Sequence, residues 1–220
     1  MKKLMTIFCS VAMLFACQGP AEQKDTGRTD SAGAPADSAL PGEASPALDS
    51  GATNNSQLII AGKQIGRIVI GMPADSLQPM LGKPDRSDAA MGKAWLSWYN
   101  KKRDEHNNRV SLDIFTAYAD NTMEKKNVQQ VRTTATNYST DKGVKVYSDL
   151  ANIQQQYPGV VNSGKYKELN SDRVFTLYDD LNSGIAFEII EANNQQICIG
   201  IIVHIPGKKL IEISPLLSGK

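Results

Sequence analysis

In this 220-residue sequence, the side chains best suited to binding or catalysis are aromatic rings, an arginine and carboxylates that lie within strand-like segments. Tryptophan, tyrosine and arginine are enriched at the centres of protein interfaces that contribute most binding energy. The six residues that we select as a protein-binding set are Trp95, Tyr99, Asp113, Arg132, Tyr178 and Glu188. We expect them to share one face of a β-sheet, although Tyr and Trp also tolerate an ordinary solvated face.

The competing interpretation is an enzyme in which two of these carboxylates act as acid and base. Asp113 and Glu188 are the one such pair that we can propose from the sequence. An acid–base site requires a pocket and a defined separation between its carboxyl groups, and the sequence indicates neither. We therefore expect no catalytic residues and no cofactor.

Histidine and cysteine are too sparse for nucleophilic or metal chemistry. Cys198 and His204 belong to one predicted strand, and six residues at about 3.3 Å each separate them by about 20 Å, which excludes a hydrogen-bonded dyad. The available histidines and thiol lack the spacing of zinc ligands, so we expect no metal site. His106 lies in the charge-rich segment 101–109, which we interpret as a solvated hairpin tip or as a docking loop.

The N-terminal residues predict export and lipidation. Two lysines precede an apolar run from Leu4 to Ala16 that is too short to span a bilayer, which is typical of a signal peptide. The sequence Leu14-Phe15-Ala16-Cys17 resembles the cleavage box of bacterial lipoproteins. We predict cleavage before Cys17 and attachment of palmitate or related acyl chains to it, and the alternative is an ordinary secretory signal.

Residues 18–56 are rich in Ala, Gly, Ser, Pro, Asp and Thr and contain no aromatic side chain. Such a stretch has too little apolar surface to offset chain entropy, so we expect a disordered tether with a root-mean-square span of about 30 to 40 Å. Of the 24 Lys and Arg residues, Lys2 and Lys3 lie in the signal, which leaves a net charge of about −1 against 23 Asp and Glu. Near-neutral, interspersed charge argues against nucleic-acid binding.

In the remainder of the chain, the first half and the second half show a similar order of apolar, polar and helix-ending residues, which indicates an internal duplication. Each half predicts an extended entry, a short helix and three antiparallel strands. Alternation along the strands places Leu96 and Trp98 against the helices together with Phe175 and Leu177, with the binding set on the other face. A shift of 76 positions aligns Ile68 with Val144, Ile70 with Val146, Leu77 with Ile153, and Leu81 with Tyr157.

Two known families resemble these halves. The sequence Ile70-Gly71-Met72, followed by a short helix and Gly82-Lys83-Pro84, resembles small outer-membrane lipoproteins that assist β-barrel assembly. The second half, with Gly143-Val144, Tyr157-Pro158 and Gly184-Ile185-Ala186-Phe187, is similar to one repeat of the β-lactamase inhibitor protein fold. These resemblances imply a protein-binding module rather than an enzyme, but a fold does not identify a partner.

These observations give one set of expectations. The expected fold class is α+β, with two tandem repeats of short helices packed on one face of an antiparallel sheet. The expected function is a membrane-anchored cell-envelope lipoprotein that binds an envelope protein without catalysis, and the alternatives are a cell-envelope hydrolase and a structural spacer. Gln18 after the lipid cysteine predicts outer-membrane sorting, facing the periplasm, in a host with two membranes. The expected segments are a signal peptide (1–16), the lipidated cysteine and tether (17–56), a first repeat (57–138), a second repeat (139–213) and a C-terminal tail (214–220).

Overall fold

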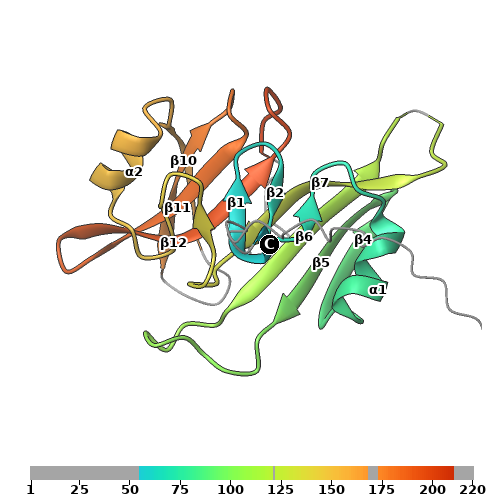
Figure 1. Cartoon of the computed structure of the whole chain (residues 1–220), viewed down its shortest axis with the longest axis horizontal. Coiled ribbons are helices and arrows are strands. Elements are labelled where there is room, and N and C mark those ends of the chain that lie inside the picture. Colours follow the sequence, from blue (N-terminus) through green and yellow to red (C-terminus); the bar gives the residue numbers. More distant parts are fainter. Residues whose placement is uncertain (1–54, 121, 168–172, 211–220) are drawn as a thin grey trace, which may run out of the picture. The chain divides into compact units, whose positions relative to one another are not determined.

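The computed structural model describes residues 55–120, 122–167 and 173–210, which are mostly β-structure (Figure 1). The larger sheet contains β4 (Arg86–Ala90), β5 (Lys93–Tyr99), β6 (Ser111–Tyr118), β7 (Lys126–Thr133), β9 (Val161–Lys167), β10 (Val174–Asp180), β11 (Ile185–Ala192) and β12 (Gln195–His204). The smaller sheet contains β1 (Leu58–Ile60), β2 (Gln64–Ile65), β3 (Ile68–Val69) and β8 (Ser139–Thr140). The helices are α1 (Leu77–Leu81) and α2 (Leu150–Gln156), and the 3-10 turns are η1 (Asn55–Gln57) and η2 (Ala74–Ser76).

The eight-stranded sheet is antiparallel throughout and joins both halves of the chain. Its strand order is β4-β5-β6-β7-β12-β11-β10-β9, so the last strands of the two halves meet at its centre. There, Val131 of β7 pairs with Val203 of β12, and Arg132 pairs with Ile202. In each half a short helix precedes the four strands that enter this sheet.

The two edge strands of this sheet, β4 and β9, do not appear among the three strands that the sequence predicts for each half. All residues of β4 are exposed, and in β9 only Tyr166 is partly buried. Alternation identifies a strand only when one of its faces is buried, so these two segments carry no such signal. Their charged side chains, including Arg86, Lys165 and Lys167, are of the kind that discourages pairing between sheet edges.

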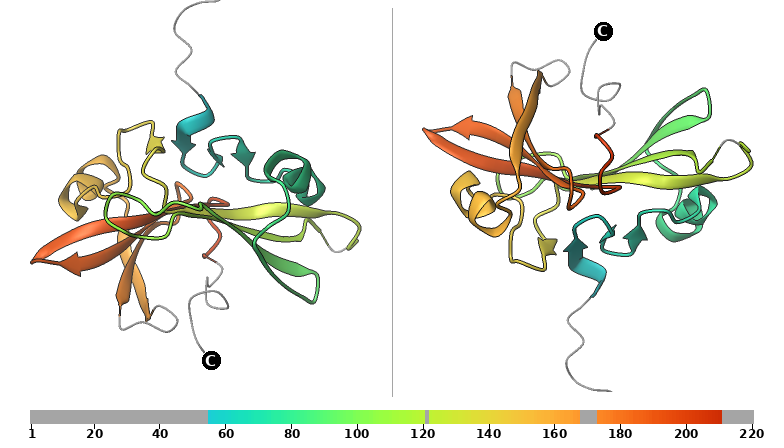
Figure 2. Two further views of the ribbon diagram at one scale, coloured as in Figure 1. Left: turned by 90° about the horizontal axis from the view of Figure 1, so that it is seen from below. Right: turned by 90° about the horizontal axis from the view of Figure 1, so that it is seen from above.

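Both helices and the smaller sheet lie on the same side of the larger sheet, as Figure 2 shows. The main core fills the space between them. Ile59 and Ile65 of the smaller sheet belong to the same buried cluster as Phe187 and Ile201 of the larger one. Removing such apolar side chains from water is the dominant stabilising contribution to a fold of this size.

Local sequence determines where the helices begin and end. The Asp149 carboxylate accepts a hydrogen bond of 2.7 Å from the Asn152 backbone N–H and so caps α2. Pro158 closely follows the end of that helix. Helix α1 has only five residues, because Pro79 restricts it and Gly82 follows in the left-handed region with φ of 78°.

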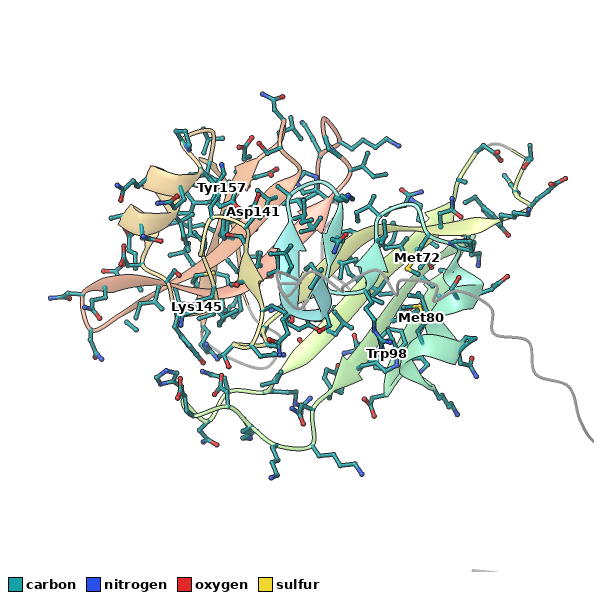
Figure 3. The ribbon with its side chains drawn as sticks, viewed as in Figure 1. Met72, Met80, Trp98, Asp141, Lys145 and Tyr157 are labelled. Carbon is teal, nitrogen blue, oxygen red and sulfur yellow. The ribbon has the colours of Figure 1, made fainter. Side chains whose placement is uncertain are left out.

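Trp98 of β5 anchors the α1 end of the main core. Its indole Nε1–H donates to the Gly82 carbonyl oxygen at 3.1 Å, while Met72 and Met80 lie beside it (Figure 3). At the other end of the core, Tyr157 stacks at a tilt against Phe187 with 5.3 Å between ring centroids. An aromatic side chain, Trp98 or Tyr157, therefore closes the main core at each end.

The predicted fold class, α+β with helices packed on one face of a sheet, is wrong. The described residues form twelve strands in two sheets and only two short helices. The physical reason is that proline and glycine limit the helices to one or two turns. The short strands β1, β2 and β3 cover the centre of the sheet instead, with Val144 and Val146 from the segment before α2. The boundaries of the predicted repeats, 57–138 and 139–213, remain a prediction.

The opposite face of the large sheet carries a smaller apolar cluster. It includes Trp95 and Phe115, whose ring centroids are 5.1 Å apart, with Ala186 and Ile202 beside them. Leu210 packs against this cluster from the end of the described chain. None of the helices in the described ranges has the length and apolar character required to cross a bilayer.

Candidate functional site around Tyr147

Four of the six residues predicted to bind a protein lie on one face of the sheet, but they are buried there. Trp95, Asp113, Arg132 and Glu188 are 4%, 5%, 6% and 0% exposed. Arg132 forms a bidentate ion pair with Glu188, with Nε–Oε1 and Nη2–Oε2 distances of 2.7 Å. Its Nη1 lies 2.7 Å from Asp113 Oδ2. These side chains hold one another within the fold and do not offer a surface to a partner.

The ion cluster tolerates burial because the Arg132 guanidinium contacts both of its carboxylates, Asp113 and Glu188. Burial opposes the positive charge of Arg132, but Glu188 and Asp113 hold the pKa of the guanidinium well above its usual range. Gly200 of β12 makes room for the pair, because a Cβ atom there would lie 2.3 Å from Glu188 Oε2. The cluster thus connects β6, β7 and β11 across the glycine of β12.

The other two predicted residues, Tyr99 and Tyr178, are only partly buried. Tyr99 is paired with Ser111, whose hydroxyl contacts Arg132 and Asp113. Tyr99 is half-buried, and the Arg109 guanidinium lies 4.9 Å from its ring centroid. Tyr178 packs against the main core on the opposite face, whereas Leu177 packs against the cluster that contains Trp95. The prediction that Leu177 faces the helices and Tyr178 does not is therefore wrong. The cause is register: Tyr178 pairs with Phe187, and an error of one residue exchanges the faces of a strand.

The buried cysteine and histidine are occupied by structural contacts. Burial raises the pKa of the Cys198 thiol to about 12, and the thiol donates to the Gly200 carbonyl oxygen at 3.3 Å. His204 has Nε2 3.0 Å from Asp179 Oδ1 and Nδ1 3.1 Å from the Ile205 carbonyl oxygen. Neither ring nitrogen is left to act as a general base. Cys17, the predicted lipidation site, lies outside the described residues.

A second candidate site consists of Tyr147 and the side chains that it contacts. It is partly exposed, and hydrogen bonds hold its side chains in place. Tyr147 follows β8 and has a φ of 75°, a left-handed conformation that is rare and strained for a bulky residue. Its backbone N–H donates to the Cys198 carbonyl oxygen at 2.7 Å. The Tyr147 side chain reaches the loop between β5 and β6, residues 100–110, which we call the β5–β6 loop.

Tyr147 contacts three side chains of the β5–β6 loop. Its hydroxyl donates to Asp104 Oδ2 and accepts a hydrogen bond of 2.7 Å from Asn108 Nδ2. The His106 ring lies edge-on to it, with 4.1 Å between centroids. Burial, together with the hydrogen bond to Asp104, raises the pKa of the Tyr147 hydroxyl to about 12, so the hydroxyl stays protonated at neutral pH.

Asp104 organises the rest of the β5–β6 loop. Its Oδ1 accepts from the backbone N–H groups of His106 at 3.0 Å and Asn108 at 2.7 Å. Partial burial acts to raise the pKa of the Asp104 carboxyl, but hydrogen bonds from Tyr147, Asn108 and His106 outweigh it and lower that pKa. Arg103 Nη1 donates to the Asn107 carbonyl oxygen at 2.8 Å. These hydrogen bonds connect residues of the loop to one another and to Tyr147, although most of the loop is exposed.

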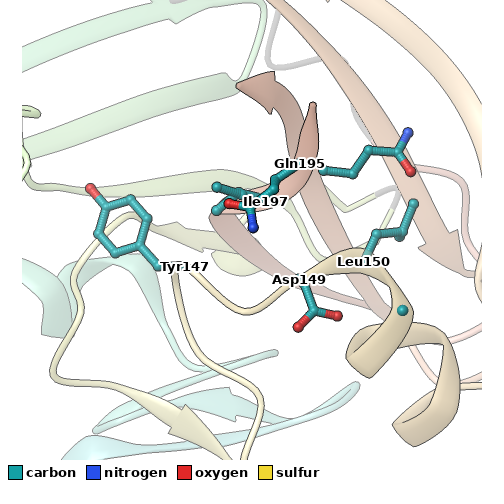
Figure 4. A pocket seen from close by; sticks show the side chains of 7 residues that line it. Tyr147, Asp149, Leu150, Gln195 and Ile197 are labelled. Atoms are coloured by element: carbon teal, nitrogen blue, oxygen red, sulfur yellow. The ribbon is translucent and has the colours of Figure 1, made fainter. Parts of the chain in front are cut away.

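A cavity of about 460 Å³ opens on the other side of Tyr147 (Figure 4). In Figure 4, Tyr147 lies to the left of Ile197 and Leu150 to its right, with Asp149 below them. The volume is within the range of small-molecule sites. The lining residues come from the segment before α2, the first turn of α2 and the start of β12, and they are Tyr147, Asp149, Leu150, Ala151, Gln195, Gln196 and Ile197.

Sequence reasoning identified the charged loop as a candidate for docking but missed Tyr147. A positive φ at a tyrosine has no signature in the sequence, since Gly, Asn and Asp are the residues usually associated with it. The contact also joins residues 39 to 43 positions apart without periodicity to indicate it. The cavity was missed for the same reason, because its polar residues lie in separate segments.

Comparisons with known proteins leave the family open. No protein-family model and no curated protein matches the sequence. Among solved structures, a DUF4309 family protein (YjgB) from Bacillus subtilis is 11% identical with a TM-score of 0.36, covering 66% of this chain and 88% of that one. The uncharacterized protein yfeY from Escherichia coli is 10% identical with a TM-score of 0.33, covering 66% and 98%. Likenesses at these scores carry no inference about this chain.

Proposed function

We propose that this chain is a lipid-anchored protein of the cell envelope whose folded part binds a protein partner without transforming it. Attachment to the membrane rests on the signal-like N-terminus and on Cys17. Binding is assigned to the β5–β6 loop rather than to the face that contains Arg132. Loops on a rigid scaffold are common binding elements, and this loop extends from a continuous eight-stranded sheet.

The observation that carries the proposal is the fixation of this exposed loop by Tyr147. A flexible charged loop would lose conformational entropy on binding, and a loop already held in place avoids much of that cost. The hydrogen bonds from Tyr147 to Asp104 and from Asn108 to Tyr147 tie the loop to the second half of the chain. The strain at Tyr147 is also typical of positions that serve function.

The charge of the loop indicates the chemistry of its partner. Residues 101–109 contain four basic and two acidic side chains. Asp104 is engaged by Tyr147 and by the loop backbone, while Lys101 and Lys102 are exposed. An acidic surface on the partner would therefore be attracted to this loop, and such complementarity affects association rate and specificity most strongly.

The arrangement of the ionisable groups favours binding over hydrolysis. Asp113 and Glu188, the only acid–base pair proposed from the sequence, are both engaged by Arg132 and nearly excluded from solvent. A general acid or base must reach the proton that it transfers. The positions of Asp113 and Glu188 therefore do not support the hydrolase alternative.

The test is in-cell crosslinking and affinity purification of the tagged full chain, with partners identified by mass spectrometry. The double variant Lys101→Glu/Lys102→Glu reverses charge on the loop, and Lys83→Glu/Lys93→Glu makes the same change at exposed positions elsewhere. We expect a partner that the first variant loses and the second retains. Equal recovery of partners by both variants, or recovery of none by the wild type, would overturn the proposal.

A further inference from the structure

We infer that the C-terminal segment 211–217 of this chain covers the apolar cluster around Trp95, on the face of the large sheet opposite the helices. The segment itself lies outside the described residues. This face is the one that the sequence assigned to a protein partner, so its occupant is instead a part of the same chain. The β5–β6 loop takes no part in this contact.

The face around Trp95 is buried, although few described side chains lie over it. Its cluster extends over strands β5 to β11 and consists of Trp95, Phe115, Ala117, Ala186 and Ile202. Two further apolar residues within the described ranges pack against this cluster: Leu177 belongs to the sheet, and Leu210 comes from outside it. A tryptophan ring is rarely excluded so fully from water, and Leu210 alone is too small to cover a face of this width.

A buried hydroxyl on the same face points to a further covering group. Ser97 lies two residues after Trp95 in β5, so the two side chains share a face. Ser97 is fully buried, and its Oγ has no hydrogen-bond partner among the described residues. A hydroxyl left in this state costs free energy. A backbone segment that crosses this face would bring both N–H donors and carbonyl acceptors to it.

The end of the described chain is directed to this face. After β12, the Gly207 backbone N–H donates to the Leu181 carbonyl oxygen at 2.7 Å, and Gly207 has a φ of 75°. The chain then passes through the exposed Lys208 and Lys209 to Leu210, which packs against the Trp95 cluster. In Figure 2 this red end of the described chain lies on the side of the large sheet away from both helices. Segment 211–217 therefore begins at the cluster.

The length and composition of the segment suit this face. When extended, its seven residues span about 23 Å, whereas the three strand spacings from β12 to β5 amount to about 14 Å. Pro215 disfavours a helix. Because the segment is attached at the cluster, its effective concentration there exceeds that of a second copy or of another protein. Four of its residues are aliphatic, namely Ile211, Ile213, Leu216 and Leu217.

NMR of the full chain tests the contact directly. We expect nuclear Overhauser contacts between the Trp95 ring and methyl groups of segment 211–217. Trp98 is the internal control, because it packs on the opposite face, against the main core, and should show no such contacts. A sample that mixes isotope-labelled and unlabelled chains distinguishes contacts within one chain from those between two copies.

Matched truncations give a second measurement. In Trp98→Phe, Trp95 is the one remaining tryptophan of the chain, so its fluorescence reports on this face alone. A chain that ends at Leu210 should emit at a longer wavelength, because Trp95 becomes exposed to water, whereas a chain that ends at Leu217 should emit as the full chain does. Circular dichroism verifies folding, and Leu216→Ser/Leu217→Ser in the same background replaces the shorter chain if that chain does not fold.

Three results would overturn the inference. They are the absence of contacts between the Trp95 ring and the methyl groups of segment 211–217, contacts that arise only between two copies, and unchanged Trp95 emission after the segment is removed or made polar. Because all these variants retain the β5–β6 loop, the crosslinking test of the protein partner is decided separately.

Discussion

Arg132 of β7 and Glu188 of β11 form a bidentate ion pair that passes over Gly200 of the intervening strand β12. The pair therefore bridges strands from the two halves of the chain at the centre of the sheet. Asp113 adds a second carboxylate from β6. A buried pair of this kind adds little net stability compared with an apolar packing, but removal of one partner leaves an uncompensated charge.

The substitution Arg132→Met should lower the free energy of unfolding by about 3 to 5 kcal/mol, because Asp113 and Glu188 would remain buried without their cation. Urea denaturation measures this change. Lys93→Met, at the exposed first residue of β5, should change stability by no more than about 0.5 kcal/mol. A loss below about 1 kcal/mol for Arg132→Met would mean that the cluster is accessible to water and therefore to a partner.

The substitution Tyr147→Phe removes the hydroxyl that joins Asp104 and Asn108 but keeps the ring against His106. Because the site is only partly buried, we expect a loss of about 1 kcal/mol in stability, with faster amide hydrogen exchange confined to the β5–β6 loop. Tyr99→Phe is the control, since Tyr99 contacts Arg109 through its ring. Unchanged exchange in the loop of Tyr147→Phe would remove the basis for a preorganised loop.

The pH dependence of the loop follows from two pKa shifts of opposite sign. Asp104 has a lowered pKa, so its stabilising contribution is present above the pKa of the unfolded chain and is lost as pH falls through the folded value. Tyr147 has a pKa raised to about 12, so its contribution is present below pH 10 and is lost as pH rises through about 12. The loop should therefore stay ordered across neutral pH.

NMR titration of the Asp104 carboxyl carbon measures the pKa of Asp104, which sets the pH dependence on the acid side. In Tyr147→Phe the pKa of Asp104 should rise, because one hydrogen bond to its ionised form is lost. The backbone donors His106 and Asn108 remain, so the rise should be partial. An Asp104 pKa that is the same in both proteins would indicate that Tyr147 does not contact the carboxylate in solution.

The sequence predicted the strands that have one buried face, and it predicted the common face of Asp113, Arg132 and Glu188. Apolar residues at every second position identify the buried face of a strand, as Ile185, Phe187 and Ile189 do in β11. The sequence did not indicate that these charged residues are buried. Their burial depends on contacts of Arg132 with both carboxylates, and those contacts form only in the folded sheet. The same limitation applies to Tyr147, whose role depends on a loop more than thirty residues away. Short helices were predicted, but the short strands β1, β2 and β3, which also cover the large sheet, were not.

Cys198 should be unreactive toward thiol reagents in the folded protein. Burial raises its pKa to about 12, and only the thiolate attacks such reagents at a useful rate. In the variant Cys9→Ser/Cys17→Ser, which leaves Cys198 as the one thiol of the chain, we expect no labelling by a chromogenic disulfide at neutral pH under native conditions, and rapid labelling after unfolding in urea. Rapid labelling of the native chain would indicate that β12 opens readily near Gly200, contrary to its central position in the sheet.

Lipidation at Cys17 is tested by growing cells with radioactive palmitate. Each buried methylene contributes about 0.8 kcal/mol, and a single acyl chain binds a membrane only reversibly, so stable anchoring requires more than one chain. We therefore expect label in the wild type and its loss in Cys17→Ser, accompanied by release of the protein from membranes. Cys9→Ser, which removes the thiol within the predicted signal, should remain labelled and membrane-bound. An unlabelled wild type would support the ordinary secretory signal instead.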